Sequence, residues 1–170
     1  MLKKVFLSVF VVGLVSAFCL GYGMLNLKKN SVYYAQHTPH SEGVEPVLME
    51  VTSNLDSIYT PDIKGIKYDY DGNNIIYNTD SNGKTAAFSY YSSELYRYYD
   101  KGDVTYVFDG NFKIVRIFDD ENLEYLSKPV DVSAVKRDIY RTVKPVVDAQ
   151  SEPFINLKWI YDWVNKDRFN

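Results

Sequence analysis

The spacing of apolar residues divides the chain into stretches with different periods. The first has no period: after MLKK come 23 residues without a charge, VFLSVFVVGLVSAFCLGYGMLNL, and then Lys28-Lys29. About 20 apolar residues span the hydrocarbon core of a bilayer, so residues 5–27 predict a membrane anchor. Val15-Ser16-Ala17 also fits the small-x-small cleavage pattern of a secretory signal peptide, which would be cut after Ala17.

Both interpretations deliver the rest of the chain across a membrane. A lipoprotein signal is disfavoured, because Phe18 stands where a small residue must precede the modified cysteine, Cys19. Lysine pairs flank the apolar run on both sides, and the N-terminal amine favours an inside N-terminus. We therefore expect a bacterial-type inner membrane protein with its domain on the extracytoplasmic side. If the chain is cleaved after Ala17, we expect export to the periplasm or secretion.

The next residues change from no period to a helical one. Residues 28–44 (KKNSVYYAQHTPHSEGV) show no periodicity and predict a linker. Glu45-Pro46 then opens a helix, since proline suits the first helical position. Apolar residues recur on one stripe of that helix, at Leu48, Val51, Leu55 and Ile58.

From Ile63 to Asp119 the period is two, which indicates strands. Turn-forming pairs recur every 8 to 11 residues, at Asp71-Gly72, Asn82-Gly83, Ser92-Ser93, Lys101-Gly102 and Asp109-Gly110. Such spacing is typical of an antiparallel up-and-down meander.

If the first four turns are two-residue loops, opposite residues share one face of the sheet. The apolar face then collects Ile66, Tyr68, Tyr70, Ile75, Tyr77, Ala86, Phe88, Tyr90, Leu95, Tyr99, Val104, Tyr106 and Phe108, with Arg97 as its one charged member. The mixed face collects Lys67, Asp69, Asn74, Ile76, Asn78, Ala87, Ser89, Tyr91, Glu94, Tyr96, Tyr98, Thr105 and Val107. A three-residue loop at 109–111 would place Phe112, Ile114 and Phe118 of a sixth strand on the apolar face.

After Asp119 the period becomes helical again. Asp131 is expected to cap a helix with a stripe at Val132, Val135, Ile139 and Val143, which Pro145 should end or kink. A last helix is expected after Pro153, with a stripe at Phe154, Leu157, Ile160, Tyr161 and Val164.

The predicted fold is α+β: an N-terminal membrane or signal segment, one helix, a five- to six-stranded antiparallel up-and-down β-meander, and two C-terminal helices packed on the apolar sheet face. The corresponding domains are a signal anchor or signal peptide at 1–27, a linker at 28–44, and an extracytoplasmic α+β domain at 45–170.

Charge and composition then exclude several classes of function. Beyond residue 29 there are 15 basic and 22 acidic residues, which disfavours nucleic-acid binding. The only cysteine, Cys19, lies in the apolar run, and the only histidines, His37 and His40, lie in the predicted linker. Nucleophilic catalysis, a metal site and a bound cofactor are therefore not expected, and we predict that the protein is not an enzyme. A weaker possibility for His37 and His40 is pH sensing.

Six aromatic or charged residues remain as candidates for binding. Tyr91, Tyr96 and Tyr98 fall on the mixed face, where they form either a platform or, beneath a covering helix, a second packing layer. Arg97 on the apolar face is either a snorkelling side chain or the anchor of an anionic ligand. Trp159 and Trp163, at i and i+4, are either core residues of the last helix or, if exposed, an interface hot spot.

These features predict a non-catalytic, membrane-anchored extracytoplasmic interaction module. Residues 5–27 would bind the membrane, and another envelope protein, such as a membrane sensor, regulator or secretion component, would be the partner. A binder of small apolar molecules or glycans, using a sheet cavity or the face of Tyr91, Tyr96 and Tyr98, is the alternative. An envelope inhibitor or immunity protein is a variant of the first interpretation.

Overall fold

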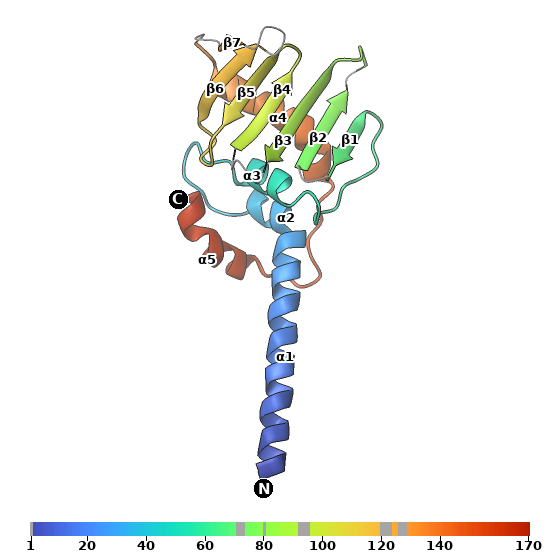
Figure 1. Cartoon of the computed structure of the whole chain (residues 1–170), viewed down its shortest axis with the longest axis vertical. Helices are drawn as coiled ribbons and strands as arrows, with labels where there is room; N and C mark the ends of the chain where they lie inside the picture. The colour runs from blue at the N-terminus through green and yellow to red at the C-terminus, as the bar shows by residue number, and fades with distance from the viewer. Residues whose placement is uncertain (1, 71–73, 80, 92–95, 120–123, 126–128) are drawn as a thin grey trace.

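A computed structural model of the chain describes residues 2–70, 74–79, 81–91, 96–119, 124–125 and 129–170 (Figure 1). The expected turns at Asp71-Gly72 and Ser92-Ser93, together with Glu94 and Leu95, lie outside these residues. The described residues form a long N-terminal helix that leads into a folded region of one sheet and four further helices.

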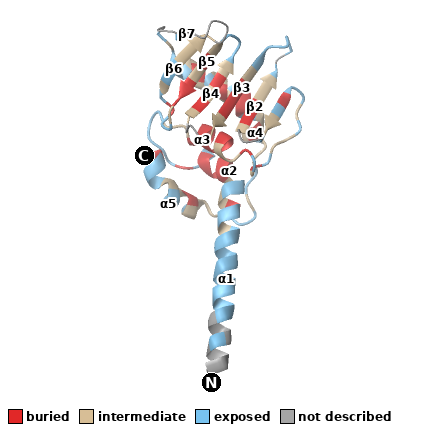
Figure 2. Cartoon of the chain, in the orientation of Figure 1, coloured by how far each residue is buried: buried red, intermediate tan, exposed pale blue. Residues whose placement is uncertain are grey.

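The N-terminal apolar run forms one continuous helix, α1 (Leu2–Lys29). Its segment Phe10–Lys29, 20 residues long, is apolar enough to cross a membrane, a property that signal sequences share. Figure 2 shows the coloured part of this helix as largely exposed below the folded region. Asn26, three residues before the end of the helix, is buried.

Residues 31–36 are packed structure, whereas a linker without periodicity was expected for residues 28–44. They form α2 (Ser31–Gln36), and Val32, Tyr34 and Ala35 on it are buried in the main hydrophobic core. Helix α3 (Pro46–Ser53) follows, with Pro46 at its first turn as expected. Its predicted stripe is buried throughout, although the last two members, Leu55 and Ile58, lie in the turns beyond the helix end.

The strands form one open antiparallel sheet in sequence order, which confirms the predicted meander and fold class (Figure 1). The final strand, which has two residues, is a seventh strand in addition to the five or six that were expected. The strands are β1 (Ile66–Asp69), β2 (Asn74–Thr79), β3 (Thr85–Tyr91), β4 (Tyr96–Lys101), β5 (Val104–Phe108), β6 (Ile114–Asp119) and β7 (Glu124–Tyr125).

The two faces sort as predicted for β1, β3, β4 and β5, but β2 is reversed. Ile76 pairs with Tyr68 and Phe88 and is buried on the apolar face, whereas Ile75 and Tyr77 lie on the other face. The reason is that five residues separate the last paired positions at each end of β2, from Asp69 to Ile75 and from Thr79 to Thr85. A connection with an odd number of residues places the side chains of the following strand on the face opposite to the one that a two-residue turn would give. The second such connection returns β3 to its predicted face.

Strand β6 also departs from a regular register. Phe112 is buried at a positive φ of 58° in the turn, and Ile114 pairs with Phe108, so both lie on the apolar side as expected. A bulge between Val107 and Phe108 then shifts the pairing, and Phe118 comes to lie on the opposite face, against expectation.

Helix α4 (Val132–Asp148) covers the apolar face of the sheet, which we call the inner face (Figure 1). Asp131 caps the helix by accepting a hydrogen bond from the Ala134 amide at 3.0 Å. The helix does not end at Pro145, one of the two outcomes that the sequence predicted, but continues to Asp148, with Val143 and Val146 buried in the core on either side. Packing outweighs the lost hydrogen bond.

Helix α5 (Lys158–Phe169) lies at the base of the folded region beside α2, and Tyr161 on it packs against Tyr34 at 5.3 Å between ring centroids (Figure 1). Of the two C-terminal helices, α4 therefore covers the sheet, while α5 packs on the helices below it. Of the predicted stripe, Tyr161 is buried, whereas Val164 and Phe154, which precedes the helix, are exposed.

Candidate functional site

The face of the sheet opposite α4, the outer face, carries the three predicted tyrosines. Tyr91, Tyr96 and Tyr98 lie on it because Tyr91 pairs with Tyr96 and Tyr98 pairs with Ser89 across β3 and β4. In the described part of the chain no helix packs on this face (Figure 1). The structure thus brings these tyrosines together on an uncovered surface.

Small side chains beneath the tyrosines are nevertheless buried. Ser89 is 1% exposed, although it lies on the outer face directly between Ile75 and Tyr98 of the neighbouring strands. Ala87 and Val107 on the same face are buried as well. Since no described helix covers them, we attribute this burial to the large side chains of the face itself.

The rings on the outer face contact one another and a cation. Tyr91 and Tyr98 meet edge to face, with 5.1 Å between ring centroids and 86° between ring planes. The guanidinium of Arg116 lies over the Tyr96 ring at 5.3 Å. These contacts order half-buried aromatic side chains on the outer face.

Tyr77 is a fourth member of this surface. The sequence placed it on the apolar face, because the face of β2 was predicted wrongly. Burial raises the pKa of Tyr77, and the negative charges of Asp69 and Asp100 nearby raise it further. Asp100 itself accepts a hydrogen bond from the Thr105 hydroxyl at 2.5 Å. We call the four half-buried rings the outer tyrosine layer: Tyr77, Tyr91, Tyr96 and Tyr98.

Arg97 lies on the inner face, as predicted, and does not join the tyrosine layer. It is 4% exposed, and its guanidinium lies over the rings of Tyr90 at 4.9 Å and Phe112 at 5.3 Å. Nη2 donates to the Ser53 hydroxyl at 3.3 Å, whereas Nε has no hydrogen-bond partner among the described residues. Burial, followed by the charge of Arg168, lowers the pKa of Arg97 to about 10.

Trp159 and Trp163 are exposed, at 71% and 76%, and lie far from the outer tyrosine layer on α5. Neither tryptophan therefore lies in the core, which was one of the two positions that the sequence left open for them. His37 and His40 are also exposed, and their Nδ1 atoms face the backbone carbonyls of Tyr33 and Thr38. Their pH-sensing role stays a prediction.

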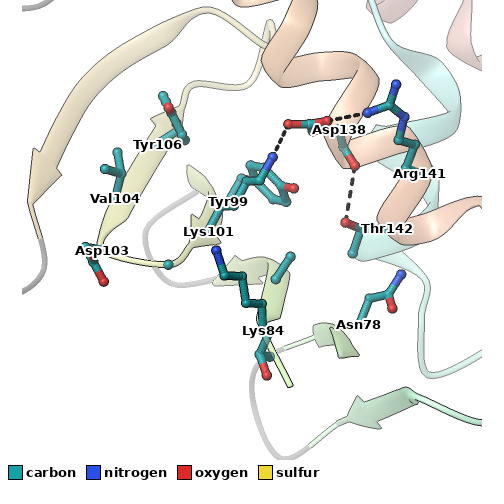
Figure 3. A pocket seen from close by; sticks show the side chains of 13 residues that line it. Asn78, Lys84, Tyr99, Lys101, Asp103, Val104, Tyr106, Asp138, Arg141 and Thr142 are labelled. Atoms are coloured by element: carbon teal, nitrogen blue, oxygen red, sulfur yellow. Dashed lines mark hydrogen bonds and ion pairs between the residues drawn. The ribbon is translucent and has the colours of Figure 1, made fainter. Parts of the chain in front are cut away.

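A groove between α4 and the β4–β5 hairpin is a second concave feature, with a volume of ≈ 710 Å³ (Figure 3). Asp138 on α4 is paired there with Lys101 and with Arg141, the latter at 3.0 Å. The hydrogen bond to Asp138 raises the pKa of Lys101. Lys84 and Asp103 add further charge to the lining of the groove.

Sequence reasoning missed this groove because its charged residues are remote in the chain. Lys101 and Asp138 are 37 positions apart and belong to different kinds of element. No local spacing links them; only the packing of α4 across the sheet does.

Among the described residues, no group of three or more His, Cys, Asp or Glu side chains is arranged to hold a metal ion. No protein-family model, curated protein or solved structure matches the chain.

Proposed function

We propose that the protein is a non-catalytic, membrane-anchored interaction module that binds another envelope protein through the outer tyrosine layer. The supporting observation is an uncovered sheet face on which four half-buried tyrosines and Arg116 gather. Tyrosine and arginine are enriched at protein interfaces and among their hot spots, because they combine large contact area with hydrogen-bonding groups.

The charge pattern of the face favours a protein over an apolar ligand. Asp69 and Asp100 surround the Tyr77 side of the layer, and Arg116 lies at the Tyr96 side. A partner therefore needs apolar area at its centre and charges of both signs at its margin, which is the usual anatomy of a protein interface.

The position of the face favours a partner in the same envelope. The strands rise away from the end of α1, so the outer face looks sideways from the anchor axis (Figure 1). With α1 in a bilayer, a protein standing beside this one, itself in or near the membrane, meets the tyrosine layer. A membrane sensor, regulator or secretion component fits this geometry.

Site-specific photo-cross-linking in intact membranes tests the proposal. A photoreactive phenylalanine analogue replaces Tyr96 in the full chain, and a matched chain carries it at Tyr59, an exposed tyrosine outside the sheet. We expect a discrete cross-linked protein from position 96 and none from position 59. Native pull-down of the unmodified chain should recover the same protein, and the Tyr91→Ala/Tyr96→Ala variant should recover at least about tenfold less.

Two results would overturn the proposal. One is that no stoichiometric partner is recovered from membranes with the anchor intact. The other is that the recovered protein binds the tyrosine variant as well as the unmodified chain. A cross-link to glycan material at position 96 would instead support the alternative of a glycan binder.

The groove at Lys101 and Asp138 favours a second candidate, a binder of a small charged molecule. Lys84, Lys101 and Arg141 face two carboxylates there, so the lining carries an excess of one positive charge. Ligand-observed NMR with a library of small carboxylates and sugars tests this candidate. Binding that is lost in the Lys101→Met variant but kept in the Lys144→Met variant, which changes an exposed lysine outside the groove, would support it.

A further inference from the structure

An exposed apolar surface lies at the base of the folded region, next to the upper end of α1. It consists of Phe154, Ile155, Trp159, Trp163 and Val164, and we call it the basal aromatic surface. Phe154 is fully exposed, and Trp159 and Trp163 project from successive turns of α5. Exposed tryptophans beside other apolar side chains mark an interaction surface.

Hydrogen bonds fix the start of this surface to α1. The Asn26 side chain of α1 donates to the Ile155 carbonyl at 3.2 Å. The buried Tyr34 hydroxyl donates to Asn26 Oδ1 at 2.8 Å and accepts from the Leu157 amide at 3.0 Å. The segment that carries Phe154 and Ile155 is therefore held at the level of Asn26.

The far end of α5 is held as well. Arg168 pairs with the buried Glu50 of α3 at 2.5 Å, and the Phe169 carbonyl accepts from the Ser41 amide at 2.9 Å. Midway, the Thr38 hydroxyl donates to Asp162 at 2.7 Å. Because both ends of the helix are attached, Trp159 and Trp163 have a fixed position relative to α1.

The level of Asn26 corresponds to the edge of a bilayer. The apolar segment Phe10–Lys29 has 20 residues, which makes it about 30 Å long and matches the hydrocarbon core. Asn26 lies three residues before Lys29, or about 4.5 Å along the helix axis. Figures 1 and 2 show α5 at the level of this end of α1 and not at the level of its middle.

Tryptophan is suited to this depth. Its ring has apolar area for the acyl chains and an N–H group for the wet headgroup layer, and tryptophans gather at membrane–water interfaces. A helix with one apolar face can lie in the plane of that interface.

We infer that the basal aromatic surface lies in the interfacial layer of the same bilayer that α1 crosses, so that the domain is held to the membrane at two places. The inference rests on α1 remaining in the membrane as an uncut anchor, as the proposed function requires. Two attachments fix the tilt of the domain, which a single helix would leave free. They keep the outer tyrosine layer turned toward neighbouring proteins in the membrane plane.

Intrinsic fluorescence tests this inference directly, because Trp159 and Trp163 are the only tryptophans in the chain. The full chain is reconstituted into vesicles of phosphatidylcholine brominated either near the headgroup or near the end of the acyl chain. We expect loss of tryptophan emission in both brominated lipids, with the larger loss from the shallow bromines. Trp159→Phe and Trp163→Phe, each leaving one tryptophan, should both show this loss.

A matched control moves the fluorophore to the far end of the sheet. Tyr125→Trp in the Trp159→Phe/Trp163→Phe background places a single tryptophan on β7, at an exposed position distant from α1 (Figure 1). Its emission should be the same in brominated and unbrominated lipid. Co-flotation of every variant with the vesicles is measured first.

The outcomes separate this inference from its premise. A chain that does not float overturns both the anchor and the basal attachment. A chain that floats, while its tryptophans are unaffected by bromine, keeps the anchor and overturns the attachment. Blue-shifted emission without bromine quenching also overturns the attachment, since protein, such as a second copy of the chain, would then be covering the surface in place of lipid.

Discussion

The inner and outer faces of the sheet both carry several tyrosines, yet they use them differently. On the inner face, Tyr99 is almost fully buried under α4 and stacks near Tyr106 at 6.4 Å. On the outer face, Tyr91 and Tyr98 are half-buried, and Ser89, which pairs with Tyr98, is buried beside them. The same residue type thus fills a core on one side and forms the outermost layer on the other.

Residues on the outer face are therefore buried although no described helix packs on that face. We attribute the burial of the small residues to the large rings around them, which leaves part of the aromatic area in water. An aromatic surface that a monomer leaves exposed is a candidate for binding. Substitutions on the two faces should therefore have different effects on stability.

The largest expected effect is on the inner face. Phe88 is fully buried and lies beside Phe112, with 6.1 Å between ring centroids. Phe88→Ala should lower the free energy of unfolding by about 3–5 kcal/mol, because it leaves a cavity that the sheet and α4 cannot close. Urea denaturation of the full chain in detergent, followed by circular dichroism, measures the loss.

The matched control is Phe118→Ala, which removes the same side chain from the outer face, where it is half-buried. We expect a clearly smaller loss of stability. Equal losses for Phe88→Ala and Phe118→Ala would show that the outer face is covered in solution.

Arg97 is the charged residue that interrupts the inner face, and its removal should have the next largest effect. Met has a similar volume, so Arg97→Met should leave the free energy of unfolding unchanged or raise it by up to about 4 kcal/mol, as for other buried charges replaced by apolar residues. Arg97→Ala should lower it through the cavity. Chemical denaturation distinguishes the two variants. If Arg97→Met lowered the free energy of unfolding as much as Arg97→Ala does, the charge itself would be shown to stabilise the fold.

Ser89, the neighbour of Phe88 in sequence, tests the outer face. Its buried hydroxyl has no hydrogen-bond partner among the described residues. Ser89→Ala should therefore raise the free energy of unfolding by about 1–3 kcal/mol, the usual cost of an unsatisfied buried polar group. Thr105→Val, which removes a hydroxyl that does donate to Asp100, should lower it in the same thermal or chemical melts. A destabilised Ser89→Ala variant would contradict this view of the outer face.

The alternation of apolar and polar residues was enough to predict the meander and the face of most strands, including the positions of Tyr91, Tyr96 and Tyr98. It was wrong for β2, because an Asp-Gly or Asn-Gly pair marks the place of a turn but not its length in paired residues. One extra residue in each connection exchanged Ile75 and Ile76. The bulge that moved Phe118 is invisible to periodicity for the same reason.

The helices show a different limit. Helical spacing predicted the buried stripe of α3 and, except for the exposed Val132, that of α4, but it placed the exposed Phe154 and Val164 in one stripe with the buried Tyr161. Periodicity reports that apolar residues share a face; it does not say whether that face meets a core, a membrane or water. The groove at Lys101 and Asp138 was beyond reach because it depends on tertiary packing alone.

The smallest expected effect concerns the edge-to-face pair on the outer face. Tyr91→Leu, Tyr98→Leu and the double variant form a double-mutant cycle that isolates the contact between the two rings. We expect a coupling of about 0.5–1.5 kcal/mol in the free energy of unfolding, because the positive edge of one ring faces the negative face of the other.

The same cycle starting from a Tyr91→Phe/Tyr98→Phe chain keeps the rings and removes the hydroxyls, so it should give the same coupling. A coupling that vanishes in the Phe background would mean that hydroxyl hydrogen bonds, and not ring geometry, order the outer tyrosine layer. The layer would then be a polar surface that offers a partner little preformed aromatic area.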